Sequence, residues 1–244
     1  MLELQDICYQ VTEDSQDIDI LRHVNLKIDD EFTVITGPNG GGKSTMAKII
    51  TGIVKPTSGK ILLDGEDITE LSITERARKG ISFAFQQPVR FKGLTVLDLL
   101  NLAHGEKLSL DAACQYMSEV GLCARDYINR EVNASLSGGE LKRIEIAMVL
   151  ARGTKLSIFD EPEAGIDLWS FARLVETFEE LRSKGTGTLL VISHQERILS
   201  IADEIVVVAD GRVRQAGPAA EVLPTLLANE KAVRCPLEKE DARV

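Results

Sequence analysis

Alternating apolar and polar residues open the chain and predict a β-hairpin. Residues 2–7 and 21–28 largely alternate apolar and polar side chains, and the acidic stretch 13–17 lies between them. A period of two is the pattern of a strand with one buried face. We therefore expect an antiparallel hairpin, followed by a short β-rich run at 32–36 that ends abruptly in glycines.

Helical and strand-like patterns then succeed one another. Residues 46–51 have helical spacing, and residues 59–65 predict a strand closed by an Asp-Gly turn. Between 94 and 120, apolar residues recur at intervals of three and four, which is typical of an amphipathic helix. Strand-like runs return at 156–159, 188–192 and 205–209, with helical stretches between them.

This order of elements predicts an α/β fold with a mainly parallel core sheet, an antiparallel β subdomain and an inserted helical lobe. We divide the chain into four segments. Residues 1–87 form the first part of the core with the antiparallel subdomain, 88–134 the helical lobe, 135–217 the second part of the core, and 218–244 a polar tail with one helix and a loose end.

Composition excludes some classes of function. The 244 residues carry a formal net charge of −10, which argues against a nucleic-acid partner because such a protein needs a basic face. No run approaches the ~20 apolar residues that span a bilayer, and the start lacks the features of a signal peptide. We expect a cytoplasmic protein without direct membrane insertion. Cys8, Cys114, Cys123 and Cys235 form no C-x-x-C pair and are interpreted as reduced structural thiols.

A glycine-rich loop between a predicted strand and a predicted helix is the first chemical motif. Residues 37–45 read GPNGGGKST, which satisfies the pattern G-x-x-x-x-G-K-[ST] in the context that it requires. Its glycines let backbone N–H groups surround a polyphosphate. We expect Lys43 to reach the β- and γ-phosphates of ATP and the Ser44 hydroxyl to bind Mg²⁺.

An acid pair at the end of an apolar strand is the second motif. Asp160 and Glu161 follow the run 156–159, at the carboxyl end where ligands sit in open α/β sheets. Asp160 suits the Mg²⁺ shell, and Glu161 is placed to polarise the attacking water.

The third motif is the string LSGGE at 136–140, which precedes a helical run. With it the sequence resembles the ABC ATPase family. Gln86 occupies the place of that family's Q-loop glutamine, residues 164–167 the place of its D-loop, and His194 the place of its switch histidine. The resemblance implies a P-loop NTPase ABC-ATPase fold and hydrolysis of ATP to ADP and phosphate.

The resemblance also implies roles for single residues. Gln86 would sense Mg²⁺ and the attacking water, and His194 would hold the γ-phosphate and orient water toward Glu161. Two copies would associate head to tail on ATP, so that the signature of one copy presses on the γ-phosphate held by the other. Nucleotide contacts are implied for Gly37, Pro38, Asn39, Gly40, Gly41, Gly42, Lys43, Ser44 and Thr45, and across the dimer for Ser137, Gly138, Gly139, Glu140 and Asp167.

Local strings narrow the resemblance to SufC, the ABC ATPase of the SUF iron–sulfur cluster assembly system. They are FAFQQPV at 83–89, REVN at 130–133, GELKR at 139–143 and SHQERIL at 193–199. The aromatic residue that commonly stacks on adenine is replaced by Val11, with Tyr9 interpreted as a packing residue of the hairpin. A region between Gln86 and 136 that looks shorter than in SufC, and a proline after the acid pair, depart from that pattern.

Two workloads therefore stay open. In a SufC-like complex, the dimer would rearrange a scaffold of SufB or SufD type. The alternative is the ATP-binding subunit of a membrane ABC transporter, acting on permease subunits. In both cases the partner would dock near residues 87–102, where Phe91, Leu94 and Leu97 are either partner anchors or core residues.

Overall fold

The computed structural model describes residues 1–13, 16–29, 31–86, 89–133, 135–185 and 187–232. Its core is a sheet of six strands, in which β10 is antiparallel to β9 and the other neighbours are parallel. The expected mainly parallel core sheet is confirmed. In spatial order the strands are β10 (Arg212–Pro218), β9 (Glu204–Ala209), β3 (Phe32–Thr36), β8 (Thr188–Ile192), β7 (Leu156–Asp160) and β6 (Ile81–Ala84).

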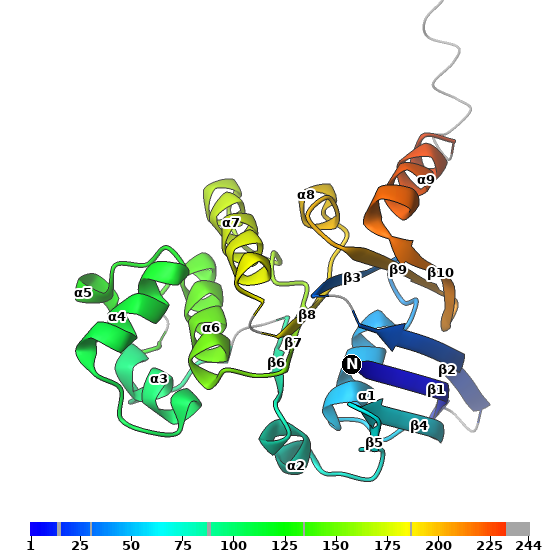
Figure 1. Ribbon diagram of the computed structural model, residues 1–244, viewed down its shortest axis with the longest axis horizontal. Helices are drawn as coiled ribbons and strands as arrows, with labels where there is room; N and C mark the ends of the chain where they lie inside the picture. Colours follow the sequence, from blue (N-terminus) through cyan, green and yellow to red (C-terminus); the bar gives the residue numbers. More distant parts are fainter. Residues whose placement is uncertain (14–15, 30, 87–88, 134, 186, 233–244) are drawn as a thin grey trace, which may run out of the picture.

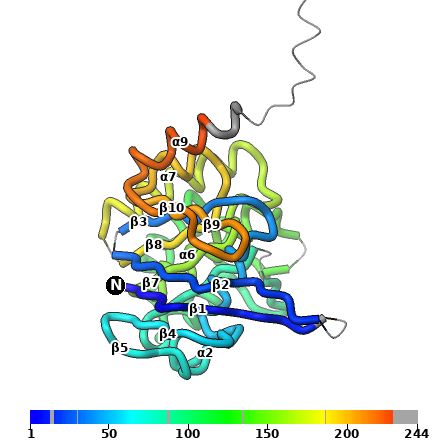
Figure 2. Tube along the Cα trace, turned by 90° about the vertical axis from the view of Figure 1, so that its right-hand side faces the viewer, coloured from blue at the N-terminus to red at the C-terminus, as the bar shows by residue number. Residues whose placement is uncertain are grey.

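A second, antiparallel sheet confirms the β subdomain. Its order is β2 (Gln16–Ile28), β1 (Leu2–Glu13), β4 (Ser58–Leu63) and β5 (Glu66–Asp67). The hairpin is longer than the pattern predicts, because side chains bond across it: Thr12 Oγ1 donates to Asp17 at 2.8 Å. Most of the expected acidic turn is therefore strand, while residues 14–15 lie outside the described part. Figure 2 shows the far end of this hairpin extending beyond the neighbouring elements.

The two faces of the core sheet pack against different layers (Figure 1). Phe32 and Phe159 point to the face that the helices cover, and the rings of Phe159 and Phe178 pack edge to face with centroids 5.2 Å apart. On the same two strands, Ile35 and Ile158 point to the opposite face. That face is covered by the helix of the glycine-rich loop and by the antiparallel sheet. The period of two within each strand therefore separates two hydrophobic layers.

Nine helices are found among the described residues, and several differ from the sequence prediction. The amphipathic stretch 94–120 is two helices, because Gly105 ends one in the left-handed region (φ 88°) and Ser109 caps the next. The helices are α1 (Lys43–Thr51), α2 (Ile73–Arg78), α3 (Val96–His104), α4 (Leu110–Glu119), α5 (Ala124–Tyr127), α6 (Gly138–Arg152), α7 (Leu168–Lys184), α8 (Glu196–Leu199) and α9 (Ala219–Ala232).

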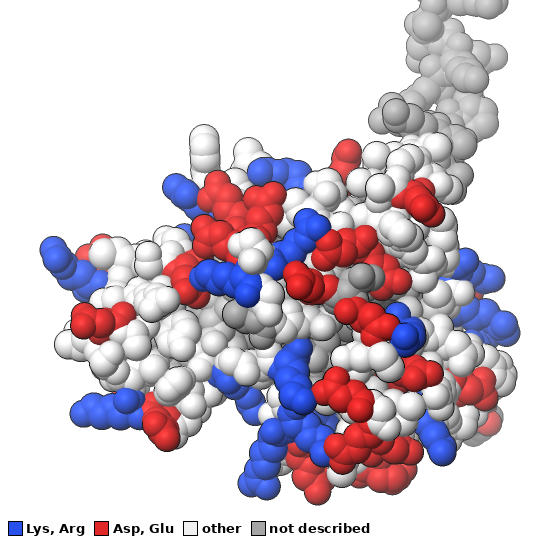
Figure 3. Space-filling model, viewed as in Figure 1, with Lys and Arg blue, Asp and Glu red and all other residues white. Residues whose placement is uncertain are grey.

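Helices α3, α4 and α5 form a lobe beside α6, at the left of Figure 1. Residues 88 and 134, the expected limits of the lobe, lie outside the described part, so the segment boundaries stay a prediction. The expected tail helix is present as α9, whereas the polar edge strand β10 before it was not predicted. Figure 3 shows acidic and basic side chains interspersed on one face, with no single broad basic area there.

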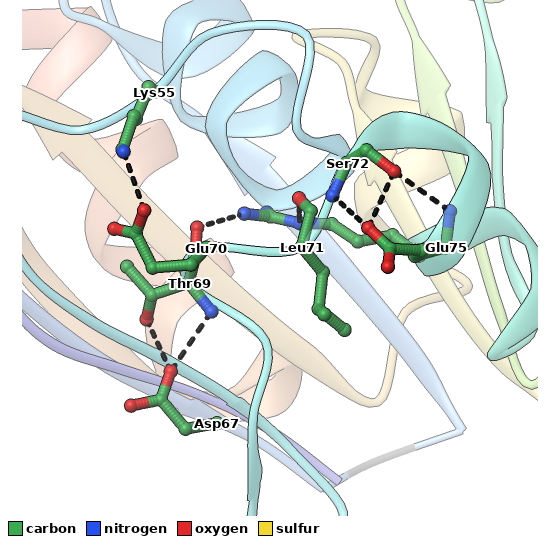
Figure 4. A network of polar contacts seen from close by, with 8 residues as sticks. Lys55, Asp67, Thr69, Glu70, Leu71, Ser72 and Glu75 are labelled. Atoms are coloured by element: carbon green, nitrogen blue, oxygen red, sulfur yellow. Dashed lines mark hydrogen bonds and ion pairs between the residues drawn. The ribbon is translucent and has the colours of Figure 1, made fainter.

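A buried arginine fixes the far end of the loop helix. The Arg76 guanidinium donates to the carbonyls of Ile49 (2.6 Å) and Ile50 (2.9 Å) at the end of α1. It also donates to the carbonyls of Thr69 (2.7 Å) and Leu71 (3.1 Å). Figure 4 shows these two residues among their polar neighbours. The Ile49 carbonyl also accepts from the Gly52 N–H at 3.1 Å, so Arg76 adds a second hydrogen bond there. At the Ile50 carbonyl it supplies a donor in the last turn, where donors within the helix are missing.

Replacing this guanidinium should therefore weaken the fold. We expect Arg76→Met to lower the free energy of unfolding by about 3 kcal/mol, because several buried carbonyls lose their donor. The matched control is Arg78→Met on the same short helix, an exposed position where the change should stay within about 0.5 kcal/mol. Urea denaturation measures both values, and equal losses would contradict the assignment.

Candidate active site

The glycine-rich loop is shaped by close backbone contacts. It leaves β3 at Gly37, whose φ is 130° and whose added Cβ would lie 2.1 Å from the carbonyl oxygen of Val208. At its end, Gly42 has φ 99°, and an added Cβ would lie 2.6 Å from the side chain of Leu21. Helix α1 begins at the next residue. The loop can therefore adopt this path only with glycine at both positions.

Lys43 curves back over the loop. Its Nζ donates to the carbonyls of Gly37 (2.7 Å) and Pro38 (2.8 Å), and the residue is buried. Burial lowers the pKa of Lys43, while the nearby carboxylates of Glu161 and Asp160 oppose that change. An ammonium group held on carbonyl oxygens at the start of this loop fits the expected exchange onto phosphate oxygens.

The predicted metal ligands Ser44 and Asp160 are in contact. The Ser44 hydroxyl, at the start of α1, donates to Asp160 Oδ1 at 3.0 Å. Burial raises the pKa of Asp160, and the Ser44 hydrogen bond opposes it. A hydroxyl beside a buried carboxylate is a hard oxygen donor set that suits Mg²⁺, and a cation there would offset the cost of burying the charge. These residues therefore fit the ion, whose binding stays a prediction.

Three predicted catalytic residues meet at one carboxylate. Gln86 follows β6, Glu161 follows β7 and His194 follows β8. Gln86 Nε2 donates to Glu161 Oε2 at 2.5 Å, and His194 Nε2 lies 3.4 Å from Glu161 Oε1. The backbone of Glu161 is in the left-handed region (φ 44°), and its N–H donates to the carbonyl of Ile192. Neighbours on both sides therefore orient the carboxylate that would polarise water.

The signature residues form a capped helix start. The Ser137 hydroxyl accepts from the N–H of Glu140 (3.2 Å), and Glu140 Oε2 accepts from the N–H of Ser137 (2.6 Å). Glu140 Oε1 accepts from the Tyr127 hydroxyl at 2.5 Å. Both carboxylate oxygens of Glu140 are thus engaged within the chain. The structure gives Glu140 a capping role, and its contact with nucleotide stays a prediction.

The signature lies against the loop that ends at Asp167. Asp167 caps α7 by accepting from the N–H groups of Trp169 and Ser170, both at 3.0 Å. A Cβ on Gly139 would lie 2.7 Å from the Ser170 hydroxyl, and one on Gly138 would lie 3.0 Å from the Gly165 carbonyl oxygen. The two glycines therefore allow this close packing.

The predicted site residues thus fall into two groups. One comprises the loop 37–45 with Gln86, Asp160, Glu161 and His194, and the other comprises residues 137–140 with Asp167. No hydrogen bond or ion pair joins the two groups within the part of the chain that the structure describes.

A buried ion pair that sequence reasoning missed holds the residue before Gln86. Lys142 is 2% exposed, and its Nζ donates to the Phe85 carbonyl and pairs with Glu145 at 3.1 Å. Glu145 Oε1 accepts from the Phe85 N–H at 3.1 Å, and burial raises the pKa of Glu145. Both backbone polar groups of Phe85 are therefore bound by α6. The only sequence signal was a lysine and a glutamate three residues apart, on a helix that carries other charged residues as well.

An apolar groove lies beside this ion pair. Phe91 is 37% exposed and lines it, whereas Leu94 and Leu97 pack against the helical core. The groove is lined by Ser82, Phe83, Phe85, Val89, Phe91, Leu99, Leu102, Ala103, Val132, Leu141, Ile144, Glu145, Met148, Val149 and Arg152.

The hairpin holds the two residues discussed for the adenine contact and one of the four cysteines. Tyr9 packs against the core beneath the antiparallel sheet, as expected, and Val11 pairs with Ile18. Cys8 is half-buried, but Cys114 and Cys123 are exposed free thiols and are not structural core residues, because both lie on the outer surface of the lobe. Cys235 lies outside the described residues.

Known proteins and one protein family are similar to most of this chain. The family described as ABC transporter matches residues 21–164. An uncharacterized ABC transporter ATP-binding protein of Methanocaldococcus jannaschii is 41% identical over 84% of this chain and 85% of its own length. The probable ATP-dependent transporter ycf16 of Cyanophora paradoxa is 34% identical over 90% and 89%.

Solved structures agree. A dimeric ATP-binding cassette in a post-hydrolysis state, bound to ADP and Pi, superposes with a TM-score of 0.80 at 27% identity, over 90% of this chain and 99% of that one. A nucleotide-free cassette from an ABC transporter gives 0.80 at 28%, over 96% and 97%. Among the described residues, no helix is long and apolar enough to cross a membrane.

The ion pair on α6 makes a two-part prediction. We expect Lys142→Met to destabilise the fold by about 3 kcal/mol, because Glu145 is left buried without its partner, and to slow ATP hydrolysis because Phe85 and Gln86 lose their anchor. Lys142→Met with Glu145→Leu should recover most of the stability but not the hydrolysis rate. Urea denaturation and steady-state phosphate release measure the two effects, and a fully active double variant would contradict the anchoring role.

Proposed function

The chain belongs to the ABC transporter family, and we propose that it couples ATP hydrolysis to the movement of a partner protein. As a member of that family it is an ABC ATPase, which binds ATP and hydrolyses it. The observation that carries the proposal is the meeting of Gln86 and His194 on the two oxygens of Glu161, next to the Ser44–Asp160 pair.

Each residue has a chemical task in this proposal. The water oxygen bonds to the γ-phosphorus as the bond from that phosphorus to the β–γ bridging oxygen breaks. ADP leaves with the electron pair, and the protons of the water end on inorganic phosphate or in solvent. Glu161 accepts a hydrogen bond from that water, while His194 and Lys43 hold phosphate oxygens. Mg²⁺ bound by Ser44 and Asp160, with Gln86 nearby, would neutralise charge on the phosphates.

The separation of the site residues into two groups supports association of two copies. In the proposed head-to-tail homodimer, Ser137–Gly139 at the start of α6 face the γ-phosphate held by the other copy. Asp167 lies beside them and would take part in the same contact. Dimeric cassettes are known among the solved structures that resemble this chain.

The names of the relatives favour membrane subunits of a transporter as the partner. They include ATP-binding proteins of the lipopolysaccharide export and energy-coupling factor systems. In this proposal a segment of the membrane subunit seats in the apolar groove, with Phe91 as an exposed anchor. The chain would then work at the cytoplasmic face of the membrane without inserting into it.

A scaffold of SufB or SufD type is the second candidate. Glu140, where importers more often have glutamine, supports it together with the strings noted above. The Glu140 carboxylate accepts from both Ser137 and Tyr127, which ties the signature to α5. A glutamine there could accept from Ser137 with its oxygen, but its amide would have to donate to the Tyr127 hydroxyl, so the direction of that bond would reverse.

Dimerisation is tested by a pair of site variants. Glu161→Gln should keep ATP binding and block hydrolysis, and at saturating ATP and Mg²⁺ it should elute with the mass of a dimer. Lys43→Ala should lose tight ATP binding and stay monomeric, because the phosphates lose their cation. Size exclusion with light scattering gives the masses. A Glu161→Gln protein that is monomeric at saturating ATP would rule out the sandwich.

The partner is tested by purification of the tagged chain from its native host, with and without detergent. Recovery of membrane subunits only in detergent supports the transporter proposal, whereas a soluble β-helical scaffold recovered without detergent replaces it with the second candidate. Phe91→Glu should reduce recovery because it places a charge in the groove. Ile18→Glu, an exposed position on the distant hairpin, is the control and should not.

A further inference from the structure

Glu163 carries a half-buried carboxyl group two residues from the proposed catalytic Glu161. The proposed hydrolysis steps give it no role. It lies in the loop between β7 and α7, two residues after Glu161. Its Oε1 accepts from the Ser193 hydroxyl at 2.5 Å. Its Oε2 is buried and has no hydrogen-bond partner in the described structure. Burying a carboxyl group with an unpartnered oxygen is costly, so the contact with Ser193 needs an explanation.

Ser193 is the residue directly before His194, and both its N–H and its hydroxyl are hydrogen-bonded. It is fully buried at the end of β8, where its N–H donates to the Ile35 carbonyl at 3.1 Å. Its hydroxyl donates to Glu163 and also accepts from the Gln195 N–H at 3.0 Å. The Ser193 hydroxyl thus binds the backbone of the residue that follows His194, and its own donor direction is set by Glu163.

The same loop is tied to Glu161. The N–H of Ala164 donates to the carbonyl of Glu161 at 3.0 Å, and the N–H of Ile166 donates to that of Glu163 at 3.3 Å. The chain from Glu161 to Glu163 is therefore a tight turn whose far side chain reaches the strand that carries His194. Across this turn, His194 Nε2 lies 3.4 Å from Glu161 Oε1.

Burial raises the pKa of Glu163, opposed by the Ser193 hydrogen bond and the nearby His194. A side chain needed only to satisfy a serine hydroxyl could be smaller and uncharged, since such a hydroxyl finds backbone carbonyl acceptors readily. A local acceptor would leave the two segments unconnected, whereas the Glu163 side chain joins the loop after β7 to the residue before His194.

We propose that Glu163 is a positioning residue for ATP hydrolysis, which through the Ser193 hydroxyl holds the His194 loop in register with Glu161. Glu163 contacts neither His194 nor Glu161 by a hydrogen bond in the described structure, and it acts on both through the turn and through Ser193. The proposal rests on the catalytic roles proposed for Glu161 and His194.

The consequence is a specific kinetic signature. Without the Glu163–Ser193 bond, the His194 ring moves relative to Glu161, and small displacements of catalytic groups are costly in rate. Most of the contacts proposed for ATP within one copy come from the loop 37–45, which this bond does not touch. The turnover number should therefore fall while the KM for ATP changes little.

The test is a double-mutant cycle on the two partners. Glu163→Ala and Ser193→Ala should each lower kcat by about ten- to a hundred-fold, with the KM for ATP within about two-fold of wild type. The double variant should lose no more than the larger single loss, because the two residues act through one bond. Glu163→Gln keeps an acceptor oxygen at the same reach and should restore kcat to within about three-fold of wild type.

Further variants separate this proposal from those on which it rests. His194→Ala should be nearly inactive, and adding Glu163→Ala to it should change kcat no further. If His194→Ala keeps its activity, the role of His194 is wrong. If His194→Ala is inactive but Glu163→Ala keeps wild-type kcat, the positioning role alone is overturned.

A merely structural role makes a different pattern. In that case the losses in the cycle would add, Glu163→Gln would not rescue, and thermal unfolding would shift in parallel with activity; any of these results overturns the proposal. The exposed Glu176→Ala on α7 is the matched control for loss of a carboxylate and should leave kcat unchanged.

Discussion

The parallel register of β3, β8, β7 and β6 is the constraint on which the site depends. Ile35 pairs with Ile192, Asp160 with Ile192, and Ala84 with Phe159. All four strands therefore end at one edge, and the next residues along each become neighbours. A slip of one residue in β7 would exchange Ile158 and Phe159 between the two hydrophobic layers and turn Asp160 away from Ser44. Packing on both faces of the sheet thus fixes the positions of polar residues beyond its edge.

That edge concentrates buried charge, which is unfavourable unless each group is compensated. Lys43 is bound by loop carbonyls, Asp160 by Ser44, and Lys142 by Glu145 and the Phe85 carbonyl. Burial raises the pKa of Asp160, and the hydrogen bond from Ser44 opposes this only in part. A site with this unsatisfied demand is stabilised further by a ligand that brings positive and negative charge together, as a metal–polyphosphate complex does.

How far the sequence could be interpreted depended on whether the signal was local. The glycine loop and the pair Asp160–Glu161 are contiguous motifs, so the residues alone indicated their chemistry. Gln86 and His194 needed the resemblance, because no local pattern distinguishes a functional glutamine or histidine from a structural one. The hydrogen bond from Lys142 to the Phe85 carbonyl joins segments 57 residues apart. The sequence of neither segment indicates that it contacts the other.

Errors in the predicted elements have equally physical causes. The strands of the hairpin are longer than the alternating apolar pattern predicts, because polar side chains such as Thr12 and Asp17 form hydrogen bonds across it. The predicted long helix is two helices, because Gly105 ends the first and Ser109 caps the start of the second. The spacing of apolar residues does not show such end signals. Strand β10 lies at the sheet edge with mostly exposed side chains, and so has no apolar pattern to reveal it.

Helix α6 links the two groups of site residues, as does the loop that runs from Glu161 to Asp167. It begins at the signature, where Ser137 and Glu140 cap it, and one turn further on Lys142 and Glu145 bind Phe85, the residue before Gln86. Glu145 also lines the apolar groove. The same helix therefore connects the signature to Phe85 and, through Glu145, to the wall of the groove.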